Sequence, residues 1–84
     1  NNPTYLDTRA WVLFKLGRYE EAKTLMQQAL ALDQSGSDEL FLHYGDILYA
    51  LKDNFMAVVY WEKAREKGYD SEEIDKRLKQ VETK

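Results

Sequence analysis

The chain has 84 residues, a formal net charge of −3 and no cysteine. This length fits one small domain, and the lack of cysteine excludes a disulfide scaffold and a thiolate metal site. The sequence has no basic stripe of the kind that binds nucleic acid, and no apolar run comes near the roughly 18 residues of a membrane-spanning helix. We therefore expect neither nucleic-acid binding nor membrane insertion. These features assign no cellular compartment.

Five helices are expected along the chain, because helix-favouring residues dominate and only four glycines and one proline interrupt them. Asn2 followed by Pro3 is typical of a helix start. Gly17 and Gly68 fit positions just after a helix end, where the backbone often turns left-handed. A loop is expected over residues 33–38. The expected helices span residues 4–16, 19–32, 39–51, 55–67 and 72–82.

The two halves of the chain resemble each other when one is shifted by 35 residues along the other. At this shift, small or apolar side chains coincide while the polar positions between them differ, which is typical of a repeat whose members share a packing pattern. The coinciding pairs include Ala10 and Gly45, Ala22 and Ala57, Met26 and Trp61, Ala29 and Ala64, and Leu16 and Leu51. Two antiparallel helices approach closely only where side chains are small. We therefore expect close helix contacts at the small positions, with Met26 and Trp61 filling the space between successive helix pairs.

The segment LGRYEEAKTLMQQALALD, residues 16–33, closely resembles the second half of a tetratricopeptide repeat, and LKDNFMAVVYWEKAREKG, residues 51–68, resembles it more loosely. The early tryptophan of the family is absent, since Leu6 and Phe41 stand at its places. The resemblance implies an all-α fold, in which antiparallel helix–turn–helix repeats stack as a right-handed α-solenoid of five helices. It divides one domain, residues 1–84, into repeat 1 at 3–36, repeat 2 at 37–69 and a capping helix at 70–84.

The two ends of this expected stack differ in polarity. The first helix is apolar over a wide arc, although the outer face of a terminal repeat is normally polar. The last helix has one apolar stripe, formed by Ile74, Leu78 and Val81. Its charged positions include three i,i+4 pairs in the favourable orientation, Glu72–Lys76, Glu73–Arg77 and Asp75–Lys79. We therefore expect a native C-terminal cap on a longer array from which this chain is a fragment, or a homodimer formed through the first helix. The resemblance implies that the longer array is bacterial.

His43 is the only histidine, and Asp46 lies three residues after it on the same expected helix face. As a catalytic pair they lack a nearby nucleophile, oxyanion donor and glycine loop. As a metal site they are two ligands short of a closed zinc centre. We therefore expect no catalytic, metal or cofactor site and no enzyme activity. The remaining interpretations are a surface pair without chemistry or part of a binding groove.

The resemblance implies that the first helices of the two pairs line a concave groove that binds a protein or peptide. The candidate groove residues are Asp7, Trp11, Phe14, Lys15, His43, Asp46 and Tyr49. Family members that grip a C-terminal carboxylate place lysine, arginine and asparagine there, whereas an acidic and aromatic groove favours an extended or helical segment with apolar and basic side chains. We expect a non-enzymatic scaffold or adaptor. The alternative is a structural end segment that mediates self-association or supports a neighbouring domain.

Two substitutions follow from this interpretation. Replacement of Trp11 or of Asp46 is expected to weaken partner binding and to leave thermal stability nearly unchanged.

Overall fold

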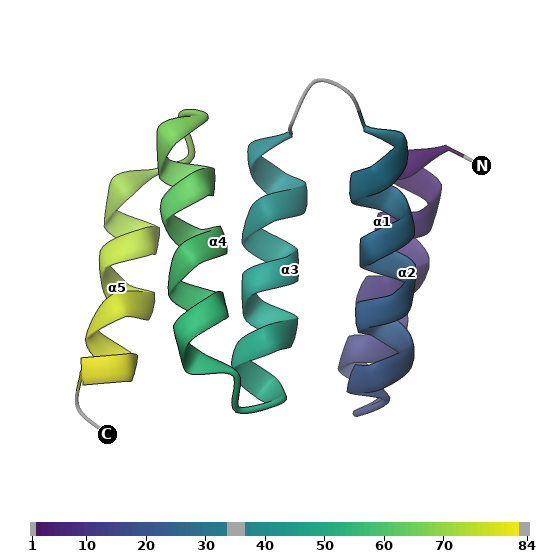
Figure 1. Ribbon diagram of the computed structural model, residues 1–84, viewed down its shortest axis with the longest axis horizontal. Helices are drawn as coiled ribbons and strands as arrows, with labels where there is room; N and C mark the ends of the chain where they lie inside the picture. Colours follow the sequence, from purple (N-terminus) through teal and green to yellow (C-terminus); the bar gives the residue numbers. More distant parts are fainter. Residues whose placement is uncertain (1, 34–36, 83–84) are drawn as a thin grey trace.

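A computed structural model gives the structure of the chain, and residues 2–33 and 37–82 are described. Five α-helices follow one another: α1 (Pro3–Lys15), α2 (Tyr19–Leu32), α3 (Asp38–Ala50), α4 (Asn54–Glu66) and α5 (Ser71–Glu82) (Figure 1). The expected all-α class is confirmed, and each helix end lies within one residue of its expected position. The central part of the expected loop, residues 34–36, and the expected ends of repeat 1 at 36 and of the cap at 84 lie outside the described residues.

Among the described residues, no helix combines the length and the apolar character that crossing a membrane would need.

Three of the helices end in the same left-handed turn. The residue that follows the last turn has a positive φ angle in each case: 81° at Gly17, 69° at Lys52 and 105° at Gly68. The next backbone N–H then donates to a carbonyl five residues earlier, as in Asp53 N to Leu48 O at 2.9 Å. This pattern satisfies the free carbonyls of a helix end and sends the chain back antiparallel to the helix it has just left. Glycine adopts the conformation without strain, whereas Lys52 does not.

The helices pack as two antiparallel hairpins and one added helix. Helix α1 packs on α2 and α3 packs on α4, while α2 joins the hairpins by contacting α3 and α5 covers α4 (Figure 1). The small positions predicted from the repeat, Ala10, Ala22 and Ala57, are completely buried. Met26 and Trp61 are also buried. The small contact positions are therefore buried as predicted, and the large residues are buried too, although the indole of Trp61 lies against Gly45 within its own hairpin.

Gly45 marks the closest approach of α3 to α4. A β-carbon built at this position would lie 2.5 Å from Cδ1 of Trp61 and 3.2 Å from the carbonyl oxygen of Ala57. The first of these distances is far below van der Waals contact, so the indole occupies the space of the missing methyl group. The equivalent pair in the first hairpin is Ala10 with Met26, where a methyl group and a flexible side chain replace glycine and the rigid indole.

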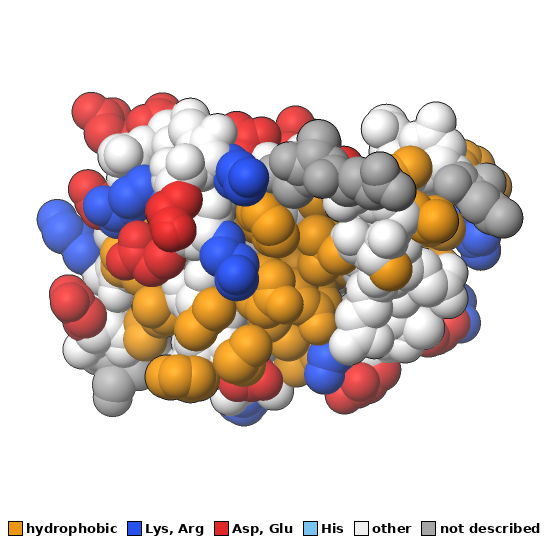
Figure 2. Space-filling model, turned by 45° about the horizontal axis from the view of Figure 1, so that its top comes forward, with side chains coloured by type: hydrophobic (Ala, Val, Ile, Leu, Met, Phe, Trp, Pro, Cys, Tyr) orange, Lys and Arg blue, Asp and Glu red, His pale blue; other side chains and the backbone are white. Residues whose placement is uncertain are grey.

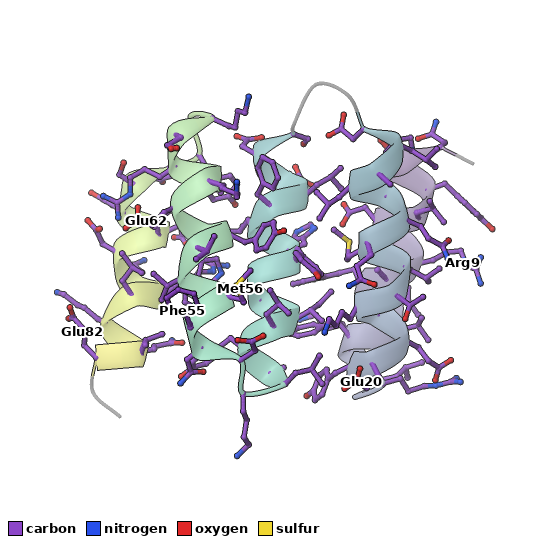
Figure 3. The ribbon with its side chains drawn as sticks, viewed as in Figure 1. Arg9, Glu20, Phe55, Met56, Glu62 and Glu82 are labelled. Carbon is purple, nitrogen blue, oxygen red and sulfur yellow. The ribbon has the colours of Figure 1, made fainter. Side chains whose placement is uncertain are left out.

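The two ends of the stack differ, as the sequence predicts. Exposed large apolar side chains cluster at the α1–α2 end: Tyr5, Val12, Leu16 and Leu32. Figure 3 places Arg9 at this edge of the molecule and Glu82, on α5, at the opposite edge. Helix α5 buries Ile74 and packs Leu78 and Val81 against the core. Figure 2 shows a further apolar area in the middle of the face that it draws. Elsewhere in the packing, Tyr60 of α4 contacts the rings of Phe41 and Tyr44 of α3.

The ion pairs of α5 differ in part from those expected. Glu73 and Arg77 pair at 3.4 Å, as predicted. Lys76, however, lies 3.4 Å from Glu73 rather than pairing with Glu72. Asp75 reaches back to Arg65 of α4 at 2.7 Å. Because α5 lies against α4, its charges find partners across the helix pair as well as along their own helix.

Candidate binding groove

Helices α1, α3 and α5 line one face of the molecule, which we call the groove. Two cavities open on it. The first, which we call the Asp7 cavity, has a volume of about 350 Å³ and lies at the N-terminal ends of α1 and α3. The second, which we call the Arg77 cavity, has a volume of about 340 Å³ and lies between the C-terminal half of α3 and α5. All seven sequence-predicted groove residues lie on α1 or α3, the helices that line this face.

An aromatic stack occupies the groove between the two cavities. The ring of Trp11 lies 4.3 Å from that of His43 and 4.7 Å from that of Phe14, with interplanar angles of 27° and 17°. The ammonium group of Lys15 lies 5.3 Å from the Trp11 ring centroid. Stacked rings fix one another, and a cation over the indole face adds a further attraction. The three rings therefore form a rigid stack, and each of its side chains is only half-buried.

His43 pairs with a different carboxylate from the one that its sequence neighbourhood indicates. Its Nδ1 lies 2.7 Å from Oδ1 of Asp7, a residue on the neighbouring helix α1. Asp7 is buried, with only 8% of its surface exposed. The imidazole is thus held on one side by a carboxylate and on its face by Trp11. Spacing along one helix could not reveal this pair, because its members are 36 residues apart.

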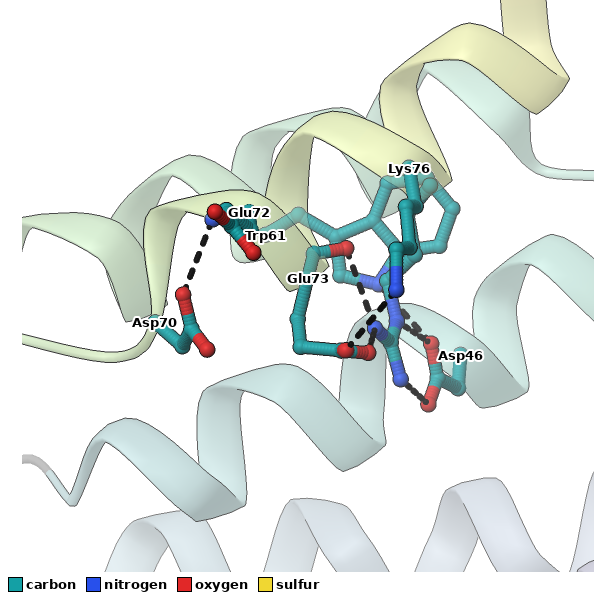
Figure 4. Close-up of polar contacts among 7 residues, drawn as sticks. Asp46, Trp61, Asp70, Glu72, Glu73 and Lys76 are labelled. Atoms are coloured by element: carbon teal, nitrogen blue, oxygen red, sulfur yellow. Dashed lines mark hydrogen bonds and ion pairs between the residues drawn. The ribbon is translucent and has the colours of Figure 1, made fainter.

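The carboxylate of Asp46 accepts hydrogen bonds from residues of α4 and α5 (Figure 4). Arg77 Nε donates to Asp46 Oδ1 at 2.8 Å, and the second guanidinium nitrogen donates to Oδ2 at 3.2 Å. The indole N–H of Trp61 also donates to Oδ1, at 3.0 Å. These hydrogen bonds to Asp46 raise the pKa of Arg77 above its ordinary value, although burial acts in the opposite direction. The expectation that Asp46 can be exchanged without loss of stability therefore does not fit the geometry.

The Arg77 cavity shows that the capping helix contributes to the groove. Lys76, Arg77 and Gln80 of α5 line it together with Tyr49 of α3 and Phe14 of α1. Tyr49 in turn packs on Trp61, with ring centroids 5.6 Å apart. Sequence reasoning missed the α5 residues, because the resemblance assigned that helix only a capping role and no local signal indicates which of its charges face inward.

A third potential cation ligand joins His43 and Asp7. Ligand atoms of Asp7, Glu39 and His43 lie within 4.8 Å of one another. The sequence analysis counted only His43 and Asp46, so the structure assembles a different set of acidic and imidazole groups from the one considered there. Among the described residues, the hydrogen-bond partner of His43 is Asp7, and no hydroxyl group or oxyanion donor is hydrogen-bonded to the imidazole.

The comparisons with known proteins agree with the helical repeat. Residues 3–35, which include α1 and α2, match the model of the tetratricopeptide repeat. Neither the curated proteins nor the solved structures contain a match to the chain.

Proposed function

The chain is a tetratricopeptide repeat protein, and we propose that its groove binds an extended or helical segment of a partner protein that carries apolar and basic side chains. Tetratricopeptide repeats generally mediate protein–protein interaction. The proposed role is that of a scaffold or adaptor, which acts by shape and charge complementarity and carries out no covalent chemistry. The partner segment would lie along α3, between the Asp7 cavity and the Arg77 cavity.

The observation that carries this proposal is the stack of Phe14, Trp11 and His43. A half-buried tryptophan fixed by neighbouring rings loses little conformational entropy when a ligand covers it, and tryptophans dominate the binding energy of many interfaces. The available cations of the groove also argue against capture of an anionic tail. Arg77 is already held by both oxygens of Asp46, Lys76 lies 3.4 Å from the Glu73 carboxylate, and Lys15 lies over Trp11.

The test uses a random dodecapeptide library displayed on phage and selected against the whole chain. Peptides that enrich are expected to bind at least tenfold more weakly to Trp11→Ala, because the variant removes the centre of the stack. Phe55→Ala is the matched control, since Phe55 is an aromatic residue of α4 with 77% of its surface exposed and does not line the groove (Figure 3). Selected peptides that bind Trp11→Ala as well as the unchanged chain would refute the groove function.

A second function is favoured by the exposed apolar end formed by α1 and α2. Tyr5 and Leu16 are 59% and 65% exposed there. Shallow cavities of about 280 and 330 Å³ lie on the same end, lined in part by Leu13 and Leu25 and by Leu6 and Leu32. Contiguous exposed apolar surface of this kind is typical of an association site. We infer that this end packs against a second copy of the chain, which would make the segment a structural element.

Sedimentation measurements test this second function. A dimer predicts a mass that rises with concentration and returns to that of the monomer in Leu16→Glu, while Phe55→Glu, on α4, leaves the association unchanged. A chain that stays monomeric at millimolar concentration would exclude self-association through this end.

A further inference from the structure

The two carboxylates of the groove differ in how their charge is balanced. Asp46 receives a bidentate ion pair from Arg77. Asp7 is the more deeply buried residue, and its only interaction among residues 2–33 and 37–82 is the contact between Oδ1 and His43. Its Oδ2 has no hydrogen-bond partner in those ranges. Asp46 therefore has a permanent cation beside it, whereas Asp7 has only the imidazole of His43 and keeps one oxygen available to a donor from outside the chain.

The surroundings of Asp7 strengthen this imbalance. Glu39 and Asp33 also line the Asp7 cavity, and its other polar walls come from Thr4 and Ser37. No lysine or arginine lines the cavity within the part of the chain that the structure describes. Since the volume of about 350 Å³ corresponds to roughly ten water molecules, the cavity has room for a group much larger than a single ion.

Two of these acids have a local structural reason to be there. Asp33 Oδ2 accepts a hydrogen bond from the backbone N–H of Ser37, and Glu39 lies in the first turn of α3, where acidic side chains favour a helix N-terminus. Asp7 has no such reason. It lies in the second turn of α1, where the backbone N–H groups are bonded within the helix. Helix capping therefore explains Asp33 and Glu39 and leaves Asp7 unexplained.

We propose that the Asp7 cavity is the recognition pocket for one lysine or arginine side chain of the partner segment, an inference that rests on the proposed groove function. The incoming ammonium or guanidinium group would donate to Asp7 Oδ2 and to the Glu39 carboxylate. His43 would keep its contact with Oδ1 and its stack on Trp11. Charge-assisted hydrogen bonds of this kind are about twice as strong as neutral ones. The pocket would set the register of the segment, with its basic residue at the N-terminal ends of α1 and α3.

A divalent metal ion bound by Asp7, Glu39 and His43 is the competing occupant. Their ligand atoms lie within 4.8 Å of one another. A metal would need a His43 nitrogen as a lone-pair donor. Binding through Nδ1 would break its 2.7 Å contact with Asp7, whereas binding through Nε2 would leave that contact in place. A basic side chain leaves every existing contact in place, and it also uses the volume of the cavity. The structure therefore favours the side chain over the ion.

The experiment uses those dodecapeptides whose binding depends on Trp11. They are expected to share a lysine or arginine at one fixed position, and its replacement by norleucine should weaken binding about tenfold. On the protein, Glu39→Gln should weaken binding about fivefold, and Asp7→Asn should do so by more, because Asp7 is buried. Glu20→Gln is the matched control, as Glu20 is an exposed glutamate of α2 outside the groove (Figure 3). Circular dichroism checks that each variant is folded.

Reversing the charge of Glu39 tests the pocket most directly. Glu39→Lys should abolish binding of the lysine-containing peptide, and a peptide with glutamate at that position should bind Glu39→Lys better than it binds the unchanged chain. Because Glu39 is exposed, this variant does not depend on the tolerance of the core for changes at Asp7.

The outcomes separate the pocket from the groove. Peptides that depend on Trp11 but bind Asp7→Asn and Glu39→Gln at full strength would overturn the pocket and leave the groove function standing. Failure to select any peptide that depends on Trp11 would overturn both. Titration of the peptide-free chain with ZnCl₂ is the third arm. Micromolar binding that disappears in His43→Ala would assign the site to a metal, and the lack of it would support the side-chain pocket.

Discussion

Gly45→Ala adds one methyl group where α3 packs against Trp61 of α4, and it tests whether this close contact requires glycine. On an exposed helix this change stabilises, because alanine is the better helix former by about 0.5–1 kcal/mol. At this position the new β-carbon would lie 2.5 Å from Cδ1 and 2.6 Å from Nε1 of Trp61. Trp61 is buried and its indole is rigid, so it can admit the new carbon only by moving as a whole side chain. Steric overlap and helix propensity therefore act in opposite directions, and their magnitudes decide the outcome.

The steric effect is expected to dominate. Forcing an extra carbon into a packed core costs about 1–3 kcal/mol. Displacement of the indole also strains the hydrogen bond from Trp61 to Asp46, whose loss would cost about 1 kcal/mol more. After subtraction of the gain in helix propensity, the free energy of unfolding should fall by roughly 1–3 kcal/mol. For a domain of this size, each kcal/mol lowers the melting temperature by about 4–8 °C.

Urea and thermal denaturation followed by circular dichroism measure this effect. The reciprocal change, Ala10→Gly, is the matched control at the equivalent position of the first hairpin, and it should also destabilise, because there a methyl group is accommodated. Trp61→Met replaces the rigid indole by a flexible side chain and, with Gly45→Ala, reproduces the Ala10 and Met26 combination of the first hairpin, so it should cost at least about 1 kcal/mol less in the Gly45→Ala background than alone. A rise in stability for Gly45→Ala, or an equal cost of Trp61→Met in both backgrounds, would refute the reasoning.

Three further predictions concern single residues. Lys52→Gly should raise the free energy of unfolding by about 0.5–1 kcal/mol in urea denaturation, because the φ angle of 69° strains any residue with a side chain. Arg77→Gln should lower it by roughly 1–2 kcal/mol, because Asp46 loses a bidentate cation at a partly exposed site; an unchanged urea midpoint would contradict this. Burial of the Tyr60 hydroxyl raises its pKa above the ordinary value of 10.0, and the neighbouring Tyr44 raises it further. The folded state therefore favours the neutral phenol, so the free energy of unfolding should be at its full value below pH 10 and fall as the pH rises beyond it. Tyr60→Phe should lessen that loss, as measured by denaturation at pH 9 and pH 11.

The sequence contains nearly all the information that determines the fold. The shift of 35 residues places Ala10 on Gly45 and Met26 on Trp61, and all four residues are buried in the fold. Helix ends were predictable because glycine at position 17 signals a left-handed turn. The equivalent turn at Lys52 carries no such signal, and only the repeat relation to Gly17 reveals it.

The site was less predictable, because it depends on how the helices face one another. His43 and Asp46 lie three residues apart, and a helical projection places them together. In the fold, His43 turns toward α1 and meets Asp7, while Asp46 turns toward α5 and meets Arg77. Since α3 is flanked by a helix on each side, two residues on one face can belong to different interfaces. Spacing along the chain cannot decide which neighbour each side chain reaches.

The packing of α4 and the Arg77 cavity depend on the same residues. Gly45 admits Trp61, the indole N–H of Trp61 donates to Asp46, and Asp46 fixes Arg77 in the wall of the cavity. The Asp7 cavity shares none of these contacts. A methyl group at position 45 should therefore alter peptide contacts near α5 and leave recognition of the basic side chain unchanged. The two cavities are connected only through the stack of Phe14, Trp11 and His43, so a variant that leaves this stack intact should report on one end of the proposed segment.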